Sequence, residues 1–459
     1  MKDANTFKEY LEKNHFVPAY IRLLLLSSRM RKFLTFGLFL AILCIASASS
    51  GRGKLSVTQS RVKFSVTHSC GKSSVTQRRT SREDLPNQRR GFPMLRERIW
   101  KSPILWPEIQ VPPYLASDTV NVVFMGDMMM HSGQIANAKV GEDSFDFSLC
   151  FPKVERLIKE ADVAVANMEF TLAGKPYTGY PCFSAPDSYA DAIAESGVDI
   201  FLTANNHILD KGRKGIERTL ERYSKMEAEG RVRHTGAAMS VRDDSLRFPL
   251  KVVAKGIRIA LINFTYGTNC RIGEEFPMVY RTDTSRIAEA VRRARGFGAD
   301  FIIALPHWGV EYSLRHSAAQ GRLARWLAEK GCDAVIGAHP HVLQDIETIT
   351  VEDAGGAGVR NVPVVYSLGN FISNMSAPNT QIGMMVTLRF TKDALGNRNM
   401  LEPLLTLTWC SRPGHLTKGY TTIPVKEYVG RRDLWLNPWD YDKMMATYNR
   451  VKKETGIKD

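Results

Sequence analysis

Several common signatures of catalytic chemistry are missing from this chain of 459 residues. It has no glycine-rich phosphate-binding loop and no serine nucleophile elbow, which argues against P-loop nucleotide hydrolysis and against a serine hydrolase of the α/β type. Cysteine is scarce, and the five cysteines after residue 115 have a scattered spacing that matches no thiolate zinc motif. Any metal site is therefore expected to use nitrogen and oxygen ligands.

Net positive charge is also small outside the amino-terminal quarter. Residues 1–110 hold 20 Lys+Arg against 7 Asp+Glu, so only +2 of the total +15 belongs to residues 111–459. A nucleic-acid-binding domain needs a basic face of its own. The sequence therefore predicts no nucleic-acid partner.

The amino-terminal segment has the layout of an export signal. Basic residues 30–32 precede an apolar run from Phe33 to Ala46, and small residues follow. We predict a leader over residues 1–48, with the true start at Met30, and an exported protein, periplasmic or at the cell surface. An uncleaved anchor is the alternative, although about 14–16 apolar residues is short against the roughly 20 of a spanning helix. Residues 49–115 are predicted to form a basic low-complexity linker.

In the rest of the chain, short apolar runs typical of buried strands each end in a polar motif. The motifs are Gly126-Asp127, Asn167-Met168-Glu169, Asn205-Asn206-His207 with Asp210, His307-Trp308-Gly309 with Glu311, His339-Pro340-His341 with Gln344, and residues 366–370 ending at Asn370. Such runs suit strands that are covered on both faces, and in open α/β sheets ligands bind at the carboxyl ends of the strands. The motifs are therefore predicted to meet at one site.

These motifs supply the ligands of a hydrolytic metal centre. The carboxylates of Asp127 and Glu169 provide negative charge, and His307, His339 and His341 provide nitrogen. Such a donor set, without thiolate, suits manganese, iron or zinc. We predict two divalent ions, which at a separation of roughly 3.5–4 Å would stabilise a phosphate-like transition state and lower the pKa of a bridging water.

Simpler structural readings stay open for the individual motifs. Gly126-Asp127 also fits a turn after a strand, and Asn205-Asn206-His207 also fits a turn whose amides cap a helix beginning near Gly215. Trp308 suits a wall of the site better than a reactive group, and Glu311 also fits the surface. The joint occurrence of the motifs, each after its own strand, favours the metal centre.

The His339-Pro340-His341 motif is the most constrained of the set. Proline fixes its own φ and disfavours the helical region for the residue before it. We therefore expect residues 338–340 to follow an extended path that holds the two imidazoles in a defined relation.

Two irregular segments carry a second open question. Tyr177–Pro186 is rich in aromatic residues, proline and glycine, and Thr265–Pro277 is long and polar. Either segment could border the site, and a rigid surface turn or an unrelated loop is the alternative.

Between the motifs, strand patterns alternate with amphipathic helical patterns, which indicates an α/β fold with a largely parallel sheet. The predicted helices cover residues 153–160, 188–196, 215–229, 284–296 and 318–330. Residues 251–254 and 257–264, separated by Lys255-Gly256, instead predict a hairpin and hence a mixed sheet.

The ordered motifs resemble those of the CapA family, the poly-γ-glutamate capsule synthesis proteins, which are related to calcineurin-like metallophosphoesterases. The resemblance rests on GD, N-x-E, ANNH-x-x-D-x-G, HWG-x-E-Y, G-x-HPHV-x-Q and YSLGNF over about residues 118–375. It implies a layered α/β/β/α metallophosphoesterase-like fold with mixed sheets over residues 116–425, followed by a C-terminal extension over 426–459.

The resemblance also implies roles for individual residues. Asp127 is expected to be the first-strand metal ligand, Glu169 the bridging carboxylate and Asn206 a ligand amide. His207, with Asp210, is the expected catalytic acid. The other motif residues are assigned to substrate binding: Asn167, Asn205, Trp308, Glu311, Gln344 and Asn370.

The chain departs from the typical metallophosphoesterase pattern at two places. The usual D-x-H is Asp127-Met128-Met129 here, and the usual GD-x-x-D is Asn167-Met168-Glu169. One metal site is therefore expected to be weaker or filled differently. His131 is a candidate for the missing imidazole, with a surface histidine as the alternative.

These features predict a CapA-type capsule biosynthesis protein whose metal-dependent hydrolase-like domain acts on an anionic cell-surface polymer such as poly-γ-glutamate, beside membrane-bound synthesis partners. A general metallophosphoesterase acting on phosphoesters is one alternative. A non-catalytic assembly protein that is stabilised by its metal is the other. The sequence alone leaves open whether the protein is an enzyme.

Overall fold

The computed structural model describes residues 119–273, 275–352 and 358–459. The predicted leader (1–48) and linker (49–115) lie outside the described residues. Within the described part of the chain, no helix combines the length and the apolar character that crossing a membrane requires.

The first large sheet joins a parallel half to an antiparallel half. Its strand order is β16-β15-β14-β1-β2-β3-β4, with β13 also paired to β1. β1 to β4 and β13 run parallel, whereas β14 to β16 run antiparallel to their neighbours. The strands are β1 (Val120–Met128), β2 (Val163–Met168), β3 (Ile200–Leu202), β4 (Arg233–Thr235), β13 (Asn370–Ile372), β14 (Ile382–Lys392), β15 (Arg398–Ser411) and β16 (Thr421–Pro424).

The second large sheet has a parallel centre and antiparallel edges, in the order β11-β12-β10-β9-β7-β6. Its strands are β6 (Leu250–Ala254), β7 (Ile257–Thr265), β9 (Phe301–His307), β10 (Ala334–Ile336), β11 (Ile346–Glu352) and β12 (Val359–Val365). β6 and β7 are the predicted hairpin across Lys255-Gly256. β5 (Ala237–Ala238) and β8 (Met278–Val279) form a small separate ladder.

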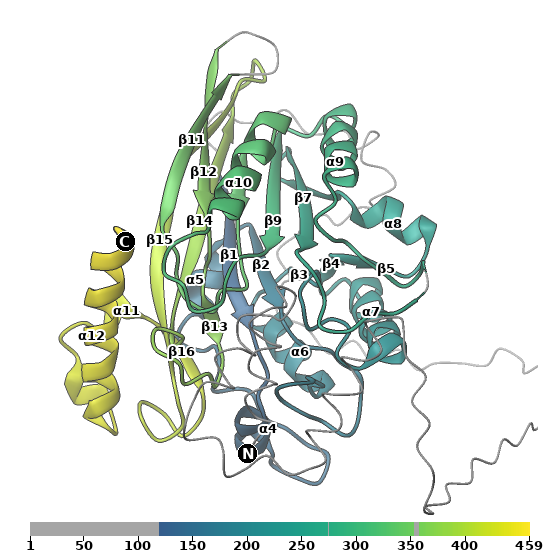
Figure 1. Cartoon of the computed structure of the whole chain (residues 1–459). Helices are drawn as coiled ribbons and strands as arrows, with labels where there is room; N and C mark the ends of the chain where they lie inside the picture. The colour runs from purple at the N-terminus through teal and green to yellow at the C-terminus, as the bar shows by residue number, and fades with distance from the viewer. Residues whose placement is uncertain (1–118, 274, 353–357) are drawn as a thin grey trace, which may run out of the picture. The chain divides into compact units, whose positions relative to one another are not determined.

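The two large sheets pack face to face, and helices cover their outer faces (Figure 1). Because side chains alternate along a strand, β1 places Val122 and Phe124 in the core between the sheets and Val123 and Met125 under the helices. The first sheet is covered by α5 (Glu155–Glu160), α6 (Asp187–Glu195) and α7 (Gly212–Ala228), and the second by α9 (Thr284–Gly296) and α10 (Ala318–Lys330). The predicted layered α/β/β/α fold with mixed sheets is confirmed.

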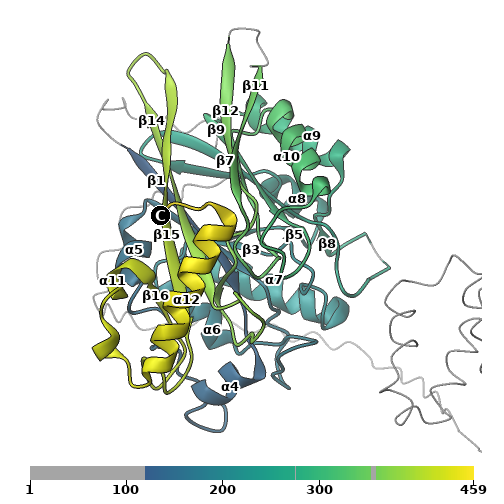
Figure 2. The same ribbon diagram turned by 60° about the vertical axis from the view of Figure 1, so that its left-hand side comes forward.

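The C-terminal segment packs into the main core. After α11 (Val425–Tyr428) and the short 3-10 helix η3 (Arg432–Leu434), α12 (Pro438–Thr455) lies beside β15 in both views (Figures 1 and 2). Met444 and Val451 of α12 are fully buried in the same cluster as Trp409 of β15. Asp440 accepts hydrogen bonds from Trp409 Nε1 at 3.2 Å and from Ser411 Oγ at 2.8 Å.

Two short helices complete the described structure, α4 (Ser132–Ala138) and α8 (Val241–Arg247). The predicted helices match α5, α6, α7, α9 and α10, although α7 begins at Gly212, three residues earlier than predicted. The cysteines of the described residues are all free thiols: Cys150, Cys182, Cys270, Cys332 and Cys410.

Candidate metal centre

The candidate ligands come from the carboxyl ends of strands in both large sheets. Asp127 lies near the end of β1, and Glu169 directly follows β2. His307 ends β9, whereas His339 and His341 follow β10 in the second sheet. Parallel strands bring their carboxyl ends to one edge, and the packing of the two sheets brings the two edges together. Residues up to 214 positions apart, such as Asp127 and His341, are therefore in contact.

These side chains form two overlapping groups that could each hold an ion. One group is Asp127, Glu169 and His307, and the other is Glu169, His339 and His341. Within each group, the ligand atoms lie within 4.8 Å of one another, and every residue is buried. Glu169 belongs to both groups, which is the position that a bridging carboxylate would occupy.

Glu169 shows that these residues fit a cation. Its side chain is fully buried, and neither carboxylate oxygen has a hydrogen-bond partner among the described residues. Burial, and next the negative charge of Asp127, raise the pKa of Glu169 well above its ordinary value. A buried carboxylate without a partner is costly, and a cation among these ligand atoms would supply the missing counter-charge.

His307 is held in a neutral, ligand-like state. Its Nε2 lies 2.8 Å from Asn206 Oδ1 and 3.6 Å from Glu169 Oε1, while Nδ1 lies 3.2 Å from Asn167 Nδ2. Burial, and then the neighbouring histidines, lower the pKa of His307 well below its ordinary value. Neutral imidazole is the form that binds metals. Asn206 Oδ1 therefore lies beside the imidazole nitrogen that also faces Glu169, and its role as a ligand amide stays a prediction.

His341 and His339 differ in what they contact. His341 Nδ1 lies 3.1 Å from Asp127 Oδ2 and 3.0 Å from Asn370 Oδ1, which leaves Nε2 facing Glu169 Oε1 at 3.7 Å. Burial alone would lower the pKa of His341, but the hydrogen bond and the charge of Asp127 raise it overall. His339 Nδ1 is buried and has no hydrogen-bond partner in the part of the chain that the structure describes, and burial is the main cause that lowers the pKa of His339 to about 3. An unpaired, neutral imidazole nitrogen is again suited to a metal ion.

The backbone of the His-Pro-His motif differs from the predicted extended path. His339 has φ 102° and His341 has φ 59°, so both non-glycine residues lie in the left-handed half of φ space. Such conformations cost roughly 1–3 kcal/mol each and persist only where the surrounding structure enforces them. Proline at 340 restricts the backbone locally, but the packing of this loop against the rest of the site determines the φ angles of His339 and His341.

A close backbone contact positions Asp127, the first candidate ligand. Asp127 N donates to Gly369 O at 3.0 Å, and a Cβ atom at Gly126 would lie 1.9 Å from the same oxygen. Only glycine at position 126 permits this approach of β1 to the segment before β13. The Gly-Asp motif is thus required by packing as well as by the carboxylate.

His207 and Asp210 form a buried pair next to the ligands. His207 Nδ1 lies 2.7 Å from Asp210 Oδ2, which also accepts a hydrogen bond from Phe183 N at 2.8 Å. The Phe183 ring meets the His207 ring edge-on at a centroid distance of 4.6 Å, and Asn269 Nδ2 lies 3.3 Å from His207 Nδ1. Asp210 therefore fixes one ring nitrogen and leaves Nε2 as the nitrogen that could exchange a proton.

Both irregular segments of uncertain role border this site. Phe183 belongs to Tyr177–Pro186, and Asn269 belongs to Thr265–Pro277. Tyr266, in the second segment, places its ring 4.7 Å from the ring of His339. The sequence marks these segments and shows Asn269 among the polar residues of the second, but it does not single out Phe183 or Tyr266, because aromatic residues are equally common in surface turns.

The residues assigned to substrate binding fall into three sets. Asn167 and Asn370 lie inside the centre, where Asn167 Nδ2 donates to Asp127 Oδ1 at 2.7 Å. Glu311 is exposed and directly precedes Tyr312, whose ring lies 6.4 Å from the ring of His341, so it lies beside the centre. The third set consists of Asn205, Trp308 and Gln344.

The members of this third set support the backbone and do not face the ligands. Asn205 Nδ2 donates to Met168 O at 2.8 Å, and Trp308 Nε1 donates to Tyr366 O at 2.9 Å. Gln344 Nε2 donates to Ser313 O at 3.0 Å. Their amide and indole groups are buried and already engaged, so a direct contact with substrate would require these bonds to break.

His131 lies near the centre without joining either ligand group. Its Nδ1 is 3.2 Å from Gln134 Oε1, and its ring meets Phe183 edge-on at 5.3 Å. Burial is the main cause that lowers its pKa to about 4. The ring therefore supports α4 and the Phe183 loop in the described structure.

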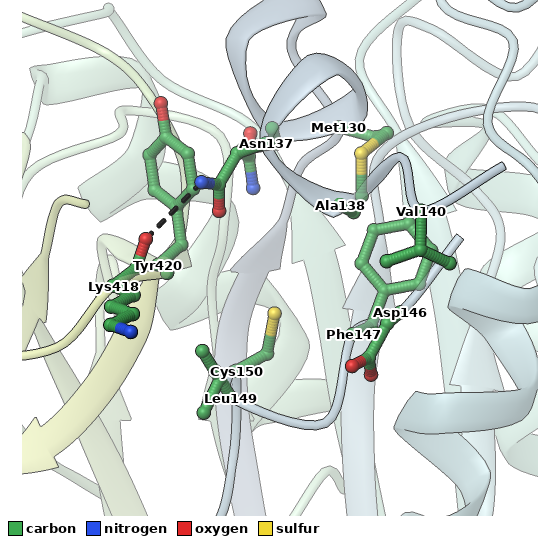
Figure 3. Close-up of a pocket in the computed structure, with 12 residues that line it drawn as sticks. Met130, Asn137, Ala138, Val140, Asp146, Phe147, Leu149, Cys150, Lys418 and Tyr420 are labelled. Atoms are coloured by element: carbon green, nitrogen blue, oxygen red, sulfur yellow. Dashed lines mark hydrogen bonds between the residues drawn. The ribbon is translucent and has the colours of Figure 1, made fainter.

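A separate cavity of about 290 Å³ lies beside α4, which contributes Gln134, Asn137 and Ala138 to its lining (Figure 3). It is bordered by Asn137, Phe147, Cys150 and Tyr420, and Asn137 Nδ2 donates to Lys418 O at 3.2 Å across it. None of the candidate metal ligands lines this cavity. It is distinct from the metal centre.

Among proteins of known sequence, the chain resembles capsule proteins of bacilli. It is 25% identical over 311 residues to the PGA biosynthesis protein CapA of Bacillus subtilis, a match that covers 65% of this chain and 74% of that protein. It is also 25% identical over 283 residues to the capsule biosynthesis protein CapA of Bacillus anthracis, covering 59% and 64%. The match thus spans less than two thirds of the second relative.

Among solved structures, the chain resembles two nucleotidases at low similarity. A putative 5′-nucleotidase from Staphylococcus aureus aligns with 13% identity and a TM-score of 0.39, over 63% of this chain and 54% of that chain. The NAD nucleotidase of Haemophilus influenzae aligns with 12% identity and a TM-score of 0.38, over 74% and 60%.

The match to a protein family covers the region that contains the candidate ligands. The family model described as bacterial capsule synthesis protein PGA_cap matches residues 121–375, a span that begins in β1 and includes all the candidate ligands. The chain belongs to this family of bacterial capsule synthesis proteins.

Proposed function

We propose that the protein is a metal-dependent hydrolase that acts on an anionic cell-surface polymer during capsule biosynthesis. The observation that carries the proposal is the buried carboxylate of Glu169, which has no hydrogen-bond partner among the described residues and is shared by two groups of ligands. Divalent ions held there would polarise the scissile group and lower the pKa of water for attack at neutral pH.

The chain's own residues would hold and orient the reacting groups. Asp127, Glu169 and His307 would hold one ion, and Glu169, His339 and His341 the other. Asn167 and Asn370 would keep Asp127 and His341 in place through their hydrogen bonds. His207, positioned by Asp210, would donate a proton to the leaving group from Nε2.

The proposal also includes the cellular location of the reaction. Export to the cell surface, followed by work beside membrane-bound synthesis partners, would bring the centre to the polymer. The names of the relatives from Bacillus support a role in capsule biosynthesis, and an end or a branch of the polymer would be the substrate.

Metal content by elemental analysis tests the proposal, measured on the purified chain and on the double variant His339→Ala/His341→Ala. We expect near two equivalents of manganese, iron or zinc in wild type and a loss of at least one in the variant. A panel of phosphoester and γ-glutamyl substrates, run in parallel, identifies the bond that is hydrolysed. A wild-type chain that stays metal-free after loading would contradict the proposal. Metal that raises thermal stability without any turnover would identify an assembly protein.

A further inference from the structure

Three exposed tyrosines lie close to the candidate metal centre. Among the described residues, the tyrosines with the most exposed side chains are Tyr180 (73%), Tyr266 (51%) and Tyr312 (46%). Tyr266 lies 4.7 Å from the ring of His339, and Tyr312 lies 6.4 Å from the ring of His341. Tyr180 lies 6.4 Å from Phe183, which contacts His207. Exposed aromatic side chains are costly to leave in water and commonly mark binding sites.

The backbone fixes two of these tyrosines to the ligand-bearing segments. Tyr266 N donates to His307 O at 2.9 Å, and Tyr312 N donates to Pro340 O at 2.8 Å. Tyr312 has φ 65°, which is a strained conformation for a tyrosine. The loop therefore holds this ring over the centre at an energetic cost, as is typical of functional positions.

The charge beside these rings is negative. Glu311 is exposed next to Tyr312, and after burial its charge and its hydrogen bond are the main causes that raise the pKa of Tyr312 to about 12. Burial, then Glu311 and Glu169, also raise the pKa of Tyr266. Two basic side chains of the neighbouring segments are already engaged, because Arg281 Nη2 donates to Thr268 Oγ1 at 2.8 Å and Arg315 Nη1 lies 3.9 Å from Asp345 Oδ2.

We infer that this rim, made of Tyr180, Tyr266, Tyr312 and Glu311, binds an ammonium group on the substrate beside the bond that is hydrolysed. Aromatic faces attract cations through their quadrupoles, and Glu311 adds a direct counter-charge. A second anion at the same place would be repelled by the carboxylate of Glu311. The inference rests on the proposed function and narrows it to one part of the substrate. An anionic polymer would offer an ammonium group to the rim at an end that carries a free amine.

Three phosphonates that cannot be hydrolysed test this inference: 2-aminoethylphosphonate, propylphosphonate and 3-phosphonopropionate. They share one head group and differ in the charge of the tail, which is positive, neutral or negative. Calorimetric titration of the manganese-loaded chain should give a Kd for the amine about 10-fold below that of the neutral compound, and the weakest binding for the carboxylate. Equal binding of all three, or tightest binding of the carboxylate, would overturn the inference.

Variants separate the rim from the metal centre. Glu311→Gln and Tyr266→Leu should each reduce the preference for the amine to under about 3-fold while the neutral compound binds as before, and Tyr266→Phe should retain it. Glu402→Gln, at an exposed glutamate of β15, is the matched control. A chain that binds metal but none of the phosphonates would contradict both the inference and a phosphoryl substrate. A chain that binds them without a charge preference would contradict the inference alone.

Discussion

The buried polar side chains around the centre are of two kinds, which differ in what they contact. Asp127, Glu169 and the histidines face one another, and parts of them have no protein partner. Asn205 and Gln344 are just as buried but have their polar groups occupied by backbone atoms. Both kinds of residue follow strands, and the neighbours Asn205 and Asn206 even carry the same side chain. Only the direction of each side chain distinguishes a ligand from a supporting residue.

Replacement of His207 by Gln is expected to separate proton transfer from metal binding. His207 is held by Asp210 at 2.7 Å and belongs to neither group of ligands. We expect kcat/KM to fall by about 10²- to 10⁴-fold with the metal content unchanged. Asp210→Asn should lower kcat/KM as well, since it weakens the hold on Nδ1.

The His316–Asp345 pair provides a matched control for this prediction, because its Nδ1–Oδ2 distance is 2.9 Å and it also lies outside both ligand groups. His316→Gln should leave kcat/KM near the wild-type value. A loss of metal from His207→Gln would instead identify His207 as a ligand.

At the scale of elements, close approaches of backbone decide how the strand ends meet. β1 pairs with β13 and β2 so that Asp127 lies opposite both Asn370 and Asn167. This register places two amides beside one carboxylate. The contact depends on glycine at 126, whose missing side chain leaves room for Gly369 O.

Gly126→Ala is therefore expected to weaken metal binding although glycine is no ligand. The added Cβ would lie 1.9 Å from Gly369 O, so β1 or the 369 segment must shift. We expect a loss of about 1–3 kcal/mol in the free energy of unfolding and a lower metal occupancy, measured by denaturant titration and elemental analysis.

Gly296→Ala serves as the control, because a Cβ at that exposed position has no atom within 4 Å. It should leave the metal occupancy unchanged and should not lower the free energy of unfolding, because alanine is favoured over glycine in a helix. Full metal occupancy in Gly126→Ala would show that the backbone can yield without moving Asp127.

At the scale of the whole molecule, the centre needs both sheets. The first sheet supplies Asp127 and Glu169, whereas the second supplies His307, and neither alone forms a complete group of ligands. α12 stabilises the first sheet at a distance from the centre by covering Trp409 and its neighbours. The C-terminal segment therefore contributes to stability through the shared core.

Met444→Ala tests this contribution of α12. Met444 is fully buried against the core, so its truncation should cost about 2–5 kcal/mol and lower the Tm. The larger but exposed Trp439, with 59% of its surface accessible, is the control, and Trp439→Ala should change the stability by less than about 1 kcal/mol. Equal effects would mean that α12 does not pack as described. Calorimetry of the two variants measures the difference.

Much of the fold could be read from local pattern. Apolar runs, helical periodicity and the Lys255-Gly256 turn indicated the strands, the outer helices and the hairpin, because each depends on neighbouring residues. The motif order further pointed to one site at the strand ends. The left-handed φ of His339 and His341 was not predicted, since long-range packing enforces it against the local preference.

The sequence by itself determined which donor atoms are available: carboxylates and imidazoles after strands, without a thiolate set. Residue chemistry and periodicity are local properties, so they can be read along the chain. Only the tertiary structure decided which donors meet and that Glu169 is shared by two groups of ligands. It also decided that the rings of Tyr266 and Tyr312 lie close to those of His339 and His341. These facts depend on the packing of two sheets whose contacting residues are far apart in sequence, and no local pattern encodes such distances.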